Sequence, residues 1–206
     1  GDFPFPRDGV SLRWPDPFLA TEARMHDSKI YAVLHYARAN RLNRIVIDSP
    51  RPRLGIITSG KSYLDVRQAL EDLGITDADA AEIGLRVYKV AMPWPLEPEG
   101  VRQFAEGLEE ILVVEEKRQV VEYQLKEQLY NWRDDVRPHV IGKFDEKGEW
   151  VRPHGDWLLP APGRAFLPFP TARNKSGSPS SSRPCLRVRA FESVRRQCRF
   201  RCRQCC

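Results

Sequence analysis

The feature that most constrains this 206-residue chain is a strand–turn–helix pattern between residues 54 and 70. An apolar run from Leu54 to Thr58 predicts a buried strand, and Ser59 with Gly60 predicts a tight turn directly after it. Beyond the turn, apolar side chains recur at helical spacing, at Tyr63, Val66, Ala69 and Leu70. Because a strand that leads straight into a helix is the building unit of α/β sheets, the segment predicts that fold class.

The same alternation continues to residue 142. Helices are predicted at 63–73, 77–83, 98–108 and 118–132, and strands at 85–90, 110–115 and, more weakly, 137–142. Gly74 ends the first helix, Thr76 or Asp77 caps the second, and Pro98 lies in the first turn of the third. The order predicts a three-layer, mainly parallel, doubly wound sheet. Continuous apolar strands must be covered on both faces, so we expect these side chains to be buried: Ile56, Ile57, Val87, Val90, Leu112, Val113 and Val114.

Residues 1–43 predict a proline-rich connector followed by a linker helix. Prolines among aromatics forbid regular structure in residues 1–18. Apolar residues at helical spacing predict a helix over residues 20–40, at Ile30, Val33, Leu34 and Ala37. Residues 44–50 form either a strand or a buried extended segment that leads into the domain. The aromatic side chains of the connector are expected to need a partner surface, namely Phe3, Phe5, Trp14 and Phe18.

Residues 55–62 match the phosphate-binding pattern Gly-x-x-x-x-Gly-Lys-Ser. That motif needs a wrapped loop between its glycines, whereas Ile56 to Ser59 have the composition of a strand. We therefore favour a structural turn with an exposed Lys61. The alternative is a small P-loop-like nucleotide-binding protein, which would bind ATP·Mg²⁺ through Lys61.

The composition changes sharply near residue 164. Residues 164–206 hold eleven of the 33 Lys and Arg residues, one of the 28 Asp and Glu residues, and all five cysteines. Three interpretations stay open: an arm that binds RNA or DNA, a metal knuckle, or a segment read in the wrong frame after about Leu159. The knuckle would use Cys198, Cys202, Cys205 and Cys206, whose spacing lacks the usual Cys-x₂-Cys pairs. The bias towards Arg, Ser and Pro favours the frame error, makes nucleic-acid binding the weaker alternative, and predicts disorder.

Few residues of the body suggest chemistry. The Glu115-Glu116-Lys117 run follows a central strand, where open α/β sheets bind ligands, but a solvated charge cluster that starts a helix is the favoured interpretation. Trp94, between two prolines, predicts an interdomain packing anchor. The four histidines, His26, His35, His139 and His154, are too scattered to pair. We therefore assign no catalytic, cofactor-binding or metal-binding residue.

The body, residues 1–163, is acidic and lacks cysteine. It therefore has no disulfide framework, which is typical of a protein from the reducing cytoplasm. No apolar run approaches the ~18 residues of a membrane span, and no secretion signal is evident, so no membrane association is expected.

Several blocks of the chain resemble the middle region of the fused indolepyruvate ferredoxin oxidoreductases, which belong to the thiamine-dependent 2-oxoacid:ferredoxin oxidoreductases. These blocks are Arg44 to Leu70, Tyr88-Lys-Val-Ala-Met-Pro-Trp-Pro-Leu-Glu-Pro98, Leu112-Val-Val-Glu-Glu-Lys117 and Gln124-Leu-Lys-Glu-Gln-Leu-Tyr-Asn131. The resemblance runs from about Phe3 to about Leu159. It implies a transketolase C-terminal-like α/β domain over residues 44–145, an extended segment over 146–163 and the tail over 164–206.

The resemblance also implies what the parent enzyme does. The family decarboxylates aryl-2-oxoacids oxidatively to acyl-coenzyme A and reduces ferredoxin, using thiamine pyrophosphate, Mg²⁺ and iron–sulfur clusters. The family's thiamine motif, Gly-Asp-Gly followed by a later Asn, does not occur here, since Gly1 and Asp2 are followed by Phe3. We therefore expect an inactive structural fragment without cofactors of its own. Its partners would be the remaining domains of a dimeric parent, with ferredoxin and coenzyme A bound through those domains.

Overall fold

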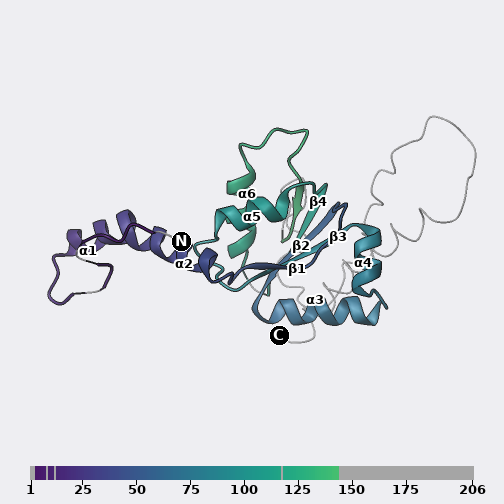
Figure 1. Ribbon diagram of the computed structural model, residues 1–206, viewed down its shortest axis with the longest axis horizontal. Coiled ribbons are helices and arrows are strands. Elements are labelled where there is room, and N and C mark those ends of the chain that lie inside the picture. Colours follow the sequence, from purple (N-terminus) through teal and green to yellow (C-terminus); the bar gives the residue numbers. More distant parts are fainter. Residues whose placement is uncertain (1–2, 8, 12, 117, 144–206) are drawn as a thin grey trace, which may run out of the picture.

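A computed structural model describes residues 3–7, 9–11, 13–116 and 118–143. Its centre is a five-stranded sheet with the order β1-β3-β2-β4-β5 (Figure 1). The strands are β1 (Arg44–Ile47), β2 (Leu54–Ser59), β3 (Leu85–Val90), β4 (Glu110–Val114) and β5 (His139–Ile141). All pairings are parallel except that of β1, which runs antiparallel to β3. The apolar segment at 44–50 is therefore a strand, and it lies at the edge of the sheet.

Two helices cover each face of the sheet. They are α3 (Gly60–Asp72) and α4 (Asp77–Ile83) on one face, and α5 (Pro98–Ala105) and α6 (Val120–Leu129) on the other. Each pair has its own apolar core: one includes Val66 and Ala80, the other Phe104 and Leu125. The predicted three-layer, doubly wound architecture is confirmed.

The predicted core is also confirmed. Ile56, Ile57 and Val87 are fully buried, and Val113 and Val114 are the most exposed of the seven expected residues at 6%. The reason is the place of β2 and β4 inside the sheet, where neighbouring strands and helices on both faces exclude water.

Helix ends account for most differences from the sequence-based prediction. Helix α5 ends at Ala105 instead of residue 108, because Gly107 adopts a left-handed φ of 80° and Leu108 turns into the core. Helix α6 is shorter than the predicted range 118–132. Thr76 is the cap of α4, and it forms a reciprocal capping box with Asp79.

The N-terminal helix is continuous but not uniform. It consists of α1 (Phe18–Arg24), a π-helical turn η1 (Met25–Lys29) and α2 (Ile30–Ala39), and it projects away from the sheet (Figure 1). Of its predicted apolar face, Ala37 alone is buried, while Val33 is exposed. The helix predicted over residues 20–40 is therefore present, and it meets the sheet domain near its C-terminal end.

Several predictions fall outside the described residues. They concern the extended segment 146–163, the tail 164–206 with its cysteines, His154 and Lys117. Within the described ranges, every helix is too short or too polar to cross a membrane.

Candidate functional site

The phosphate-loop pattern is a strand in the structure. Residues Gly55 to Ser59 belong to β2, and α3 begins at Gly60. A Cβ atom on Gly55 would lie 2.5 Å from Leu108 Cδ1 and 2.8 Å from Phe104 Cζ, so this glycine is needed for packing. Lys61 Nζ lies 2.9 Å from Asp65 Oδ1, one helical turn away. The predictions that Ile56 to Ser59 form a strand and that Lys61 is exposed are confirmed, whereas the predicted separate turn at Ser59 and Gly60 is wrong, because β2 leads directly into α3.

The carboxylate of Glu115 follows β4 and binds the start of α6. It accepts hydrogen bonds from the backbone N–H groups of Val121 at 2.8 Å and Glu122 at 3.2 Å. Burial raises the pKa of Glu115, and these N–H groups oppose the shift. The favoured interpretation was right that the charges start a helix, but Glu115 is half-buried and not solvated.

Glu122 was missed by the sequence analysis. Its side chain is fully buried, yet it pairs with Lys126 Nζ at 2.7 Å and accepts the backbone N–H of Lys143 at 2.7 Å. A Cβ on Gly142 would overlap the Glu122 carboxylate, so strand β5 ends where a glycine makes room for a charge. The i,i+4 spacing of Glu122 and Lys126 was the available signal.

Trp94 is presented on a loop that α6 holds in place. Gln124 accepts a hydrogen bond from the Leu96 N–H at 2.7 Å and donates to the Pro93 carbonyl at 2.8 Å. Gln128 donates to the Leu96 carbonyl at 3.0 Å. The Trp94 ring itself is 64% exposed. An apolar ring on a fixed loop fits the predicted role as a packing anchor, which stays a prediction.

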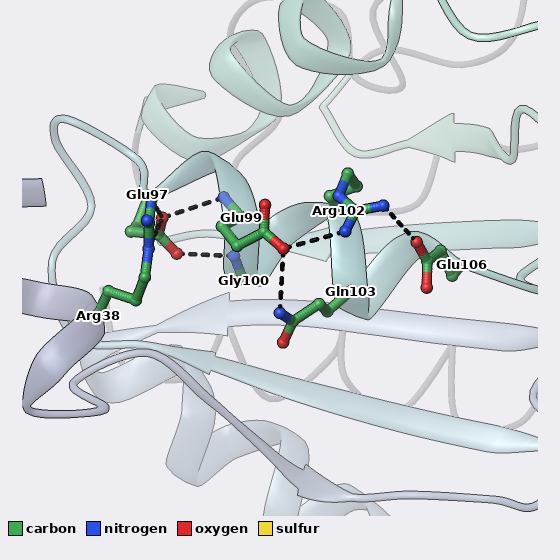
Figure 2. Close-up of polar contacts among 7 residues, drawn as sticks. All are labelled: Arg38, Glu97, Glu99, Gly100, Arg102, Gln103 and Glu106. Atoms are coloured by element: carbon green, nitrogen blue, oxygen red, sulfur yellow. Dashed lines mark hydrogen bonds and ion pairs between the residues drawn. The ribbon is translucent and has the colours of Figure 1, made fainter. Parts of the chain in front are cut away.

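Glu97 joins the N-terminal helix to the sheet domain (Figure 2). Its carboxylate is 3% exposed, and it caps α5 by accepting the N–H groups of Glu99 at 3.0 Å and Gly100 at 2.6 Å. Arg38 of α2 donates to the same carboxylate through Nη2 at 2.6 Å and Nε at 3.0 Å. The sequence analysis placed Pro98 in the first turn but did not identify Glu97 as the cap.

The N-terminal arm, residues 3–39, displays aromatic side chains. Trp14 is 97% exposed, and Phe5, Phe18 and Tyr36 are also exposed. Phe3 packs at its edge against Phe5 and lies 5.5 Å from the His35 ring. Most of the connector aromatics are therefore exposed, while Phe3 finds contacts inside the arm, and the partner surface for the exposed rings stays a prediction.

The histidines of the described residues lie on different elements. His26 and His35 lie on the arm and His139 on β5. Over residues 3–143, apart from the masked positions, no three His, Cys, Asp or Glu side chains converge as metal ligands. The described residues therefore do not fit the Mg²⁺-bound diphosphate that the family resemblance implies, because such an ion needs several converging oxygen ligands.

Known proteins resemble this chain over most of the sheet domain. The family model of the indolepyruvate ferredoxin oxidoreductase middle domain matches residues 43–177, which extends beyond the predicted end of the resemblance near Leu159. The indolepyruvate oxidoreductase subunit IorA of Methanothermobacter thermautotrophicus is 30% identical over 146 residues, covering 68% of this chain and 22% of its own length. The IorA subunit of Thermococcus kodakarensis is 37% identical over 79 residues, which cover 38% of this chain and 11% of that subunit.

A solved structure is also similar. The 2-oxoglutarate:ferredoxin oxidoreductase from Magnetococcus marinus is 18% identical, with a TM-score of 0.41, over 62% of this chain and 21% of its own. This chain thus spans a small part of the length of each relative. Because the model of the middle domain matches residues 43–177, well over half of the chain, the chain belongs to the indolepyruvate ferredoxin oxidoreductase family.

Proposed function

We propose that this chain is a structural interdomain module of an enzyme that decarboxylates aryl-2-oxoacids oxidatively to acyl-coenzyme A and reduces ferredoxin. In this proposal, thiamine pyrophosphate, Mg²⁺ and iron–sulfur clusters belong to the other domains of a dimeric, cytoplasmic parent. The family match and the relatives' names support the reaction class. The module's own task is to hold neighbouring domains in place.

The observation that carries the proposal is the exposed aromatic surface of the N-terminal arm. Trp14 at 97% and Phe18 at 80% leave nearly their whole apolar area in water. Covering such area contributes roughly 25 cal/mol per Å², so the arm gains stability when another protein surface packs on it. Trp94 adds an exposed ring on a loop fixed by Gln124. Surfaces of this kind suit permanent contacts between domains.

The polar groups of the domain suit a structural task as well. Glu97, Glu115 and Glu122 each accept backbone N–H groups or pair with a neighbouring cation. In these contacts the carboxylates hold the starts of α5 and α6 and the end of β5 in place. We derive no thiamine-dependent step for this chain.

A chimeric enzyme tests the proposal. Residues 43–177 of this chain replace the corresponding segment of the Methanothermobacter thermautotrophicus IorA subunit, and reduction of ferredoxin by indolepyruvate is measured with thiamine pyrophosphate, Mg²⁺ and coenzyme A. The full chain alone is assayed in the same mixture. In the matched control chimera, a flexible linker of the same length replaces that segment of the subunit.

The expected result is turnover by the chimera, with none by the chain alone or by the linker control. Turnover by the chain alone would overturn the proposal, since the module would then carry chemistry. A soluble chimera that assembles but is as inactive as the linker control would equally contradict it.

A further inference from the structure

A pocket of about 410 Å³ lies where α2 ends and β1 begins, beside the start of α5. Its size falls within the range of small-molecule sites. Its lining includes the polar side chains of Arg38, Arg41, Asn43, Arg44, Tyr88 and Glu97. The sequence analysis assigned no ligand to these residues, and the proposed structural function requires none.

The acidic groups of the pocket already have partners. Glu97 is neutralised by Arg38 at 2.6 Å and caps α5. Glu99 accepts hydrogen bonds from Arg102 at 3.0 Å and Gln103 at 3.2 Å (Figure 2). Neither carboxylate therefore needs a further cation, and the pocket does not have the character of a metal site.

Two cations of the pocket are uncommitted. Among the described residues, no hydrogen bond or ion pair involves the guanidinium groups of Arg41 and Arg44, and both residues are exposed. Arg41 is held in a left-handed backbone conformation, with φ of 48°, at the turn that follows α2. Arg41 in this turn, Arg44 at the start of β1 and Arg38 outnumber the carboxylates of Glu97 and Glu99, so the pocket has a net positive charge.

Asn43 adds a buried donor to these charges. Its Oδ1 accepts the backbone N–H groups of Ala91 at 2.9 Å and Met92 at 3.1 Å, which fixes the orientation of the amide. Its Nδ2 is left buried with no hydrogen-bond partner among the described residues. A buried donor without an acceptor costs free energy, and a ligand oxygen would remove that cost.

Tyr88 supplies a second buried donor. The residue is 2% exposed, and its hydroxyl has no hydrogen-bond partner among the described residues. A Cβ on Gly100 would overlap this hydroxyl, so the glycine makes room for the hydroxyl beside the start of α5. Burial and the nearby Glu97 charge raise the pKa of Tyr88, which keeps the hydroxyl protonated and able to donate.

We propose that this pocket binds a small oxyanion, the phosphate or carboxylate group of a small molecule, between Arg41, Arg44, Asn43 Nδ2 and the Tyr88 hydroxyl. The arginines supply charge and forked donors, which suit both kinds of oxyanion. The two buried donors then gain the acceptor that the described residues do not provide. The site is independent of the parent reaction and uses residues of this chain alone.

The experiment titrates the full chain with inorganic phosphate and, separately, with malonate, at constant ionic strength. The readout is the side-chain amide signal of Asn43 in a ¹⁵N–¹H correlation spectrum, assigned with the Asn43→Ala variant. This signal reports the pocket, whereas bulk affinity would also count anions bound by the arginine-rich tail. The test variant is Arg41→Ala/Arg44→Ala, and the matched control is Arg51→Ala/Arg133→Ala, which removes the same charge elsewhere.

The expected result is a saturating shift of the Asn43 signal with at least one probe. The probe that saturates identifies the oxyanion class. The Arg41→Ala/Arg44→Ala variant should weaken this binding about tenfold or more, while the control variant and the folded spectrum stay unchanged. The proposal is wrong if neither probe shifts the signal to saturation, or if the test and control variants bind alike.

Discussion

The guanidinium of Arg38 lies 2.6 Å from the carboxylate of Glu97, although 59 residues separate them in the chain. This pair is where the N-terminal arm is fastened to the sheet domain. The same carboxylate caps α5, so a single buried group sets both the start of a core helix and the attachment of the arm.

Removing this carboxylate should weaken the fold substantially. We expect Glu97→Ala to lower the free energy of unfolding by about 1–3 kcal/mol, because a helix cap is lost together with an ion pair whose arginine is half-exposed. Urea denaturation of the full chain measures the change. Glu106→Ala, at an exposed carboxylate that pairs with Arg102, is the control and should leave the midpoint nearly unchanged. Equal effects of the two substitutions would contradict the role assigned to Glu97.

Gly55→Ala should destabilise the domain by about 1–3 kcal/mol, the usual cost of overpacking a core. The new methyl group would meet Leu108 and Phe104, both buried between α5 and the sheet. Thermal unfolding followed by circular dichroism tests this. A variant as stable as the wild type would mean that the α5 face repacks freely, which the close contacts argue against.

Lys61→Ala should change the free energy of unfolding by no more than about 0.5 kcal/mol, as an exposed substitution does. Melting temperatures with and without ATP·Mg²⁺ provide the second measurement, and we expect no ligand-dependent rise for either protein. A rise that is present in the wild type and absent in the variant would restore the nucleotide-binding hypothesis.

The pKa of Glu115 is raised by burial, so its ionisation opposes folding. The folded state binds the proton more tightly than the unfolded state, and the stability from this group is therefore lost as the pH rises above the ordinary glutamate pKa. Glu115→Gln removes this pH dependence. The free energy of unfolding of the variant minus that of the wild type should therefore increase from pH 4 to pH 8, so that the variant becomes relatively more stable.

Denaturation curves across that pH range provide the test. Other carboxylates, such as Glu109 beside Arg53, have lowered pKa values and act in the opposite direction, but they are common to both proteins and cancel in the difference. A difference that is constant with pH would show that Glu115 has no raised pKa.

The apolar pattern was sufficient to predict the sheet and its core. Leu85–Val90 and Asp77–Ile83 were predicted with the observed bounds, because a Gly or a capping Thr marks their ends. The direction of β1 was not predictable, because a four-residue strand with three apolar residues fits the edge of a sheet in either direction. The choice depends on contacts between Ile45 and Tyr88, which lie far apart in the chain.

The site was harder to predict, since its groups are neighbours in space alone. Asn43 lies just before β1 and Tyr88 lies in β3, and nothing in the local sequence marks either as a buried donor without a partner among the described residues. Glu122 looked like one of many charges on a surface helix, and its burial depends on Lys143 arriving from β5. The sequence also did not predict that the arm projects from the domain, because apolar residues at helical spacing do not show which surface covers them.

The antiparallel direction of β1 decides at which end of the sheet the N-terminal arm is attached. Arg44, the first residue of β1, lies opposite Lys89, near the end of β3. The chain therefore enters the sheet at the end where the parallel strands finish, beside the Trp94 loop and the start of α6. A protein seated on the arm thus approaches the carboxyl ends of the strands, and the opposite end, where Arg53 pairs with Glu109, points away from it.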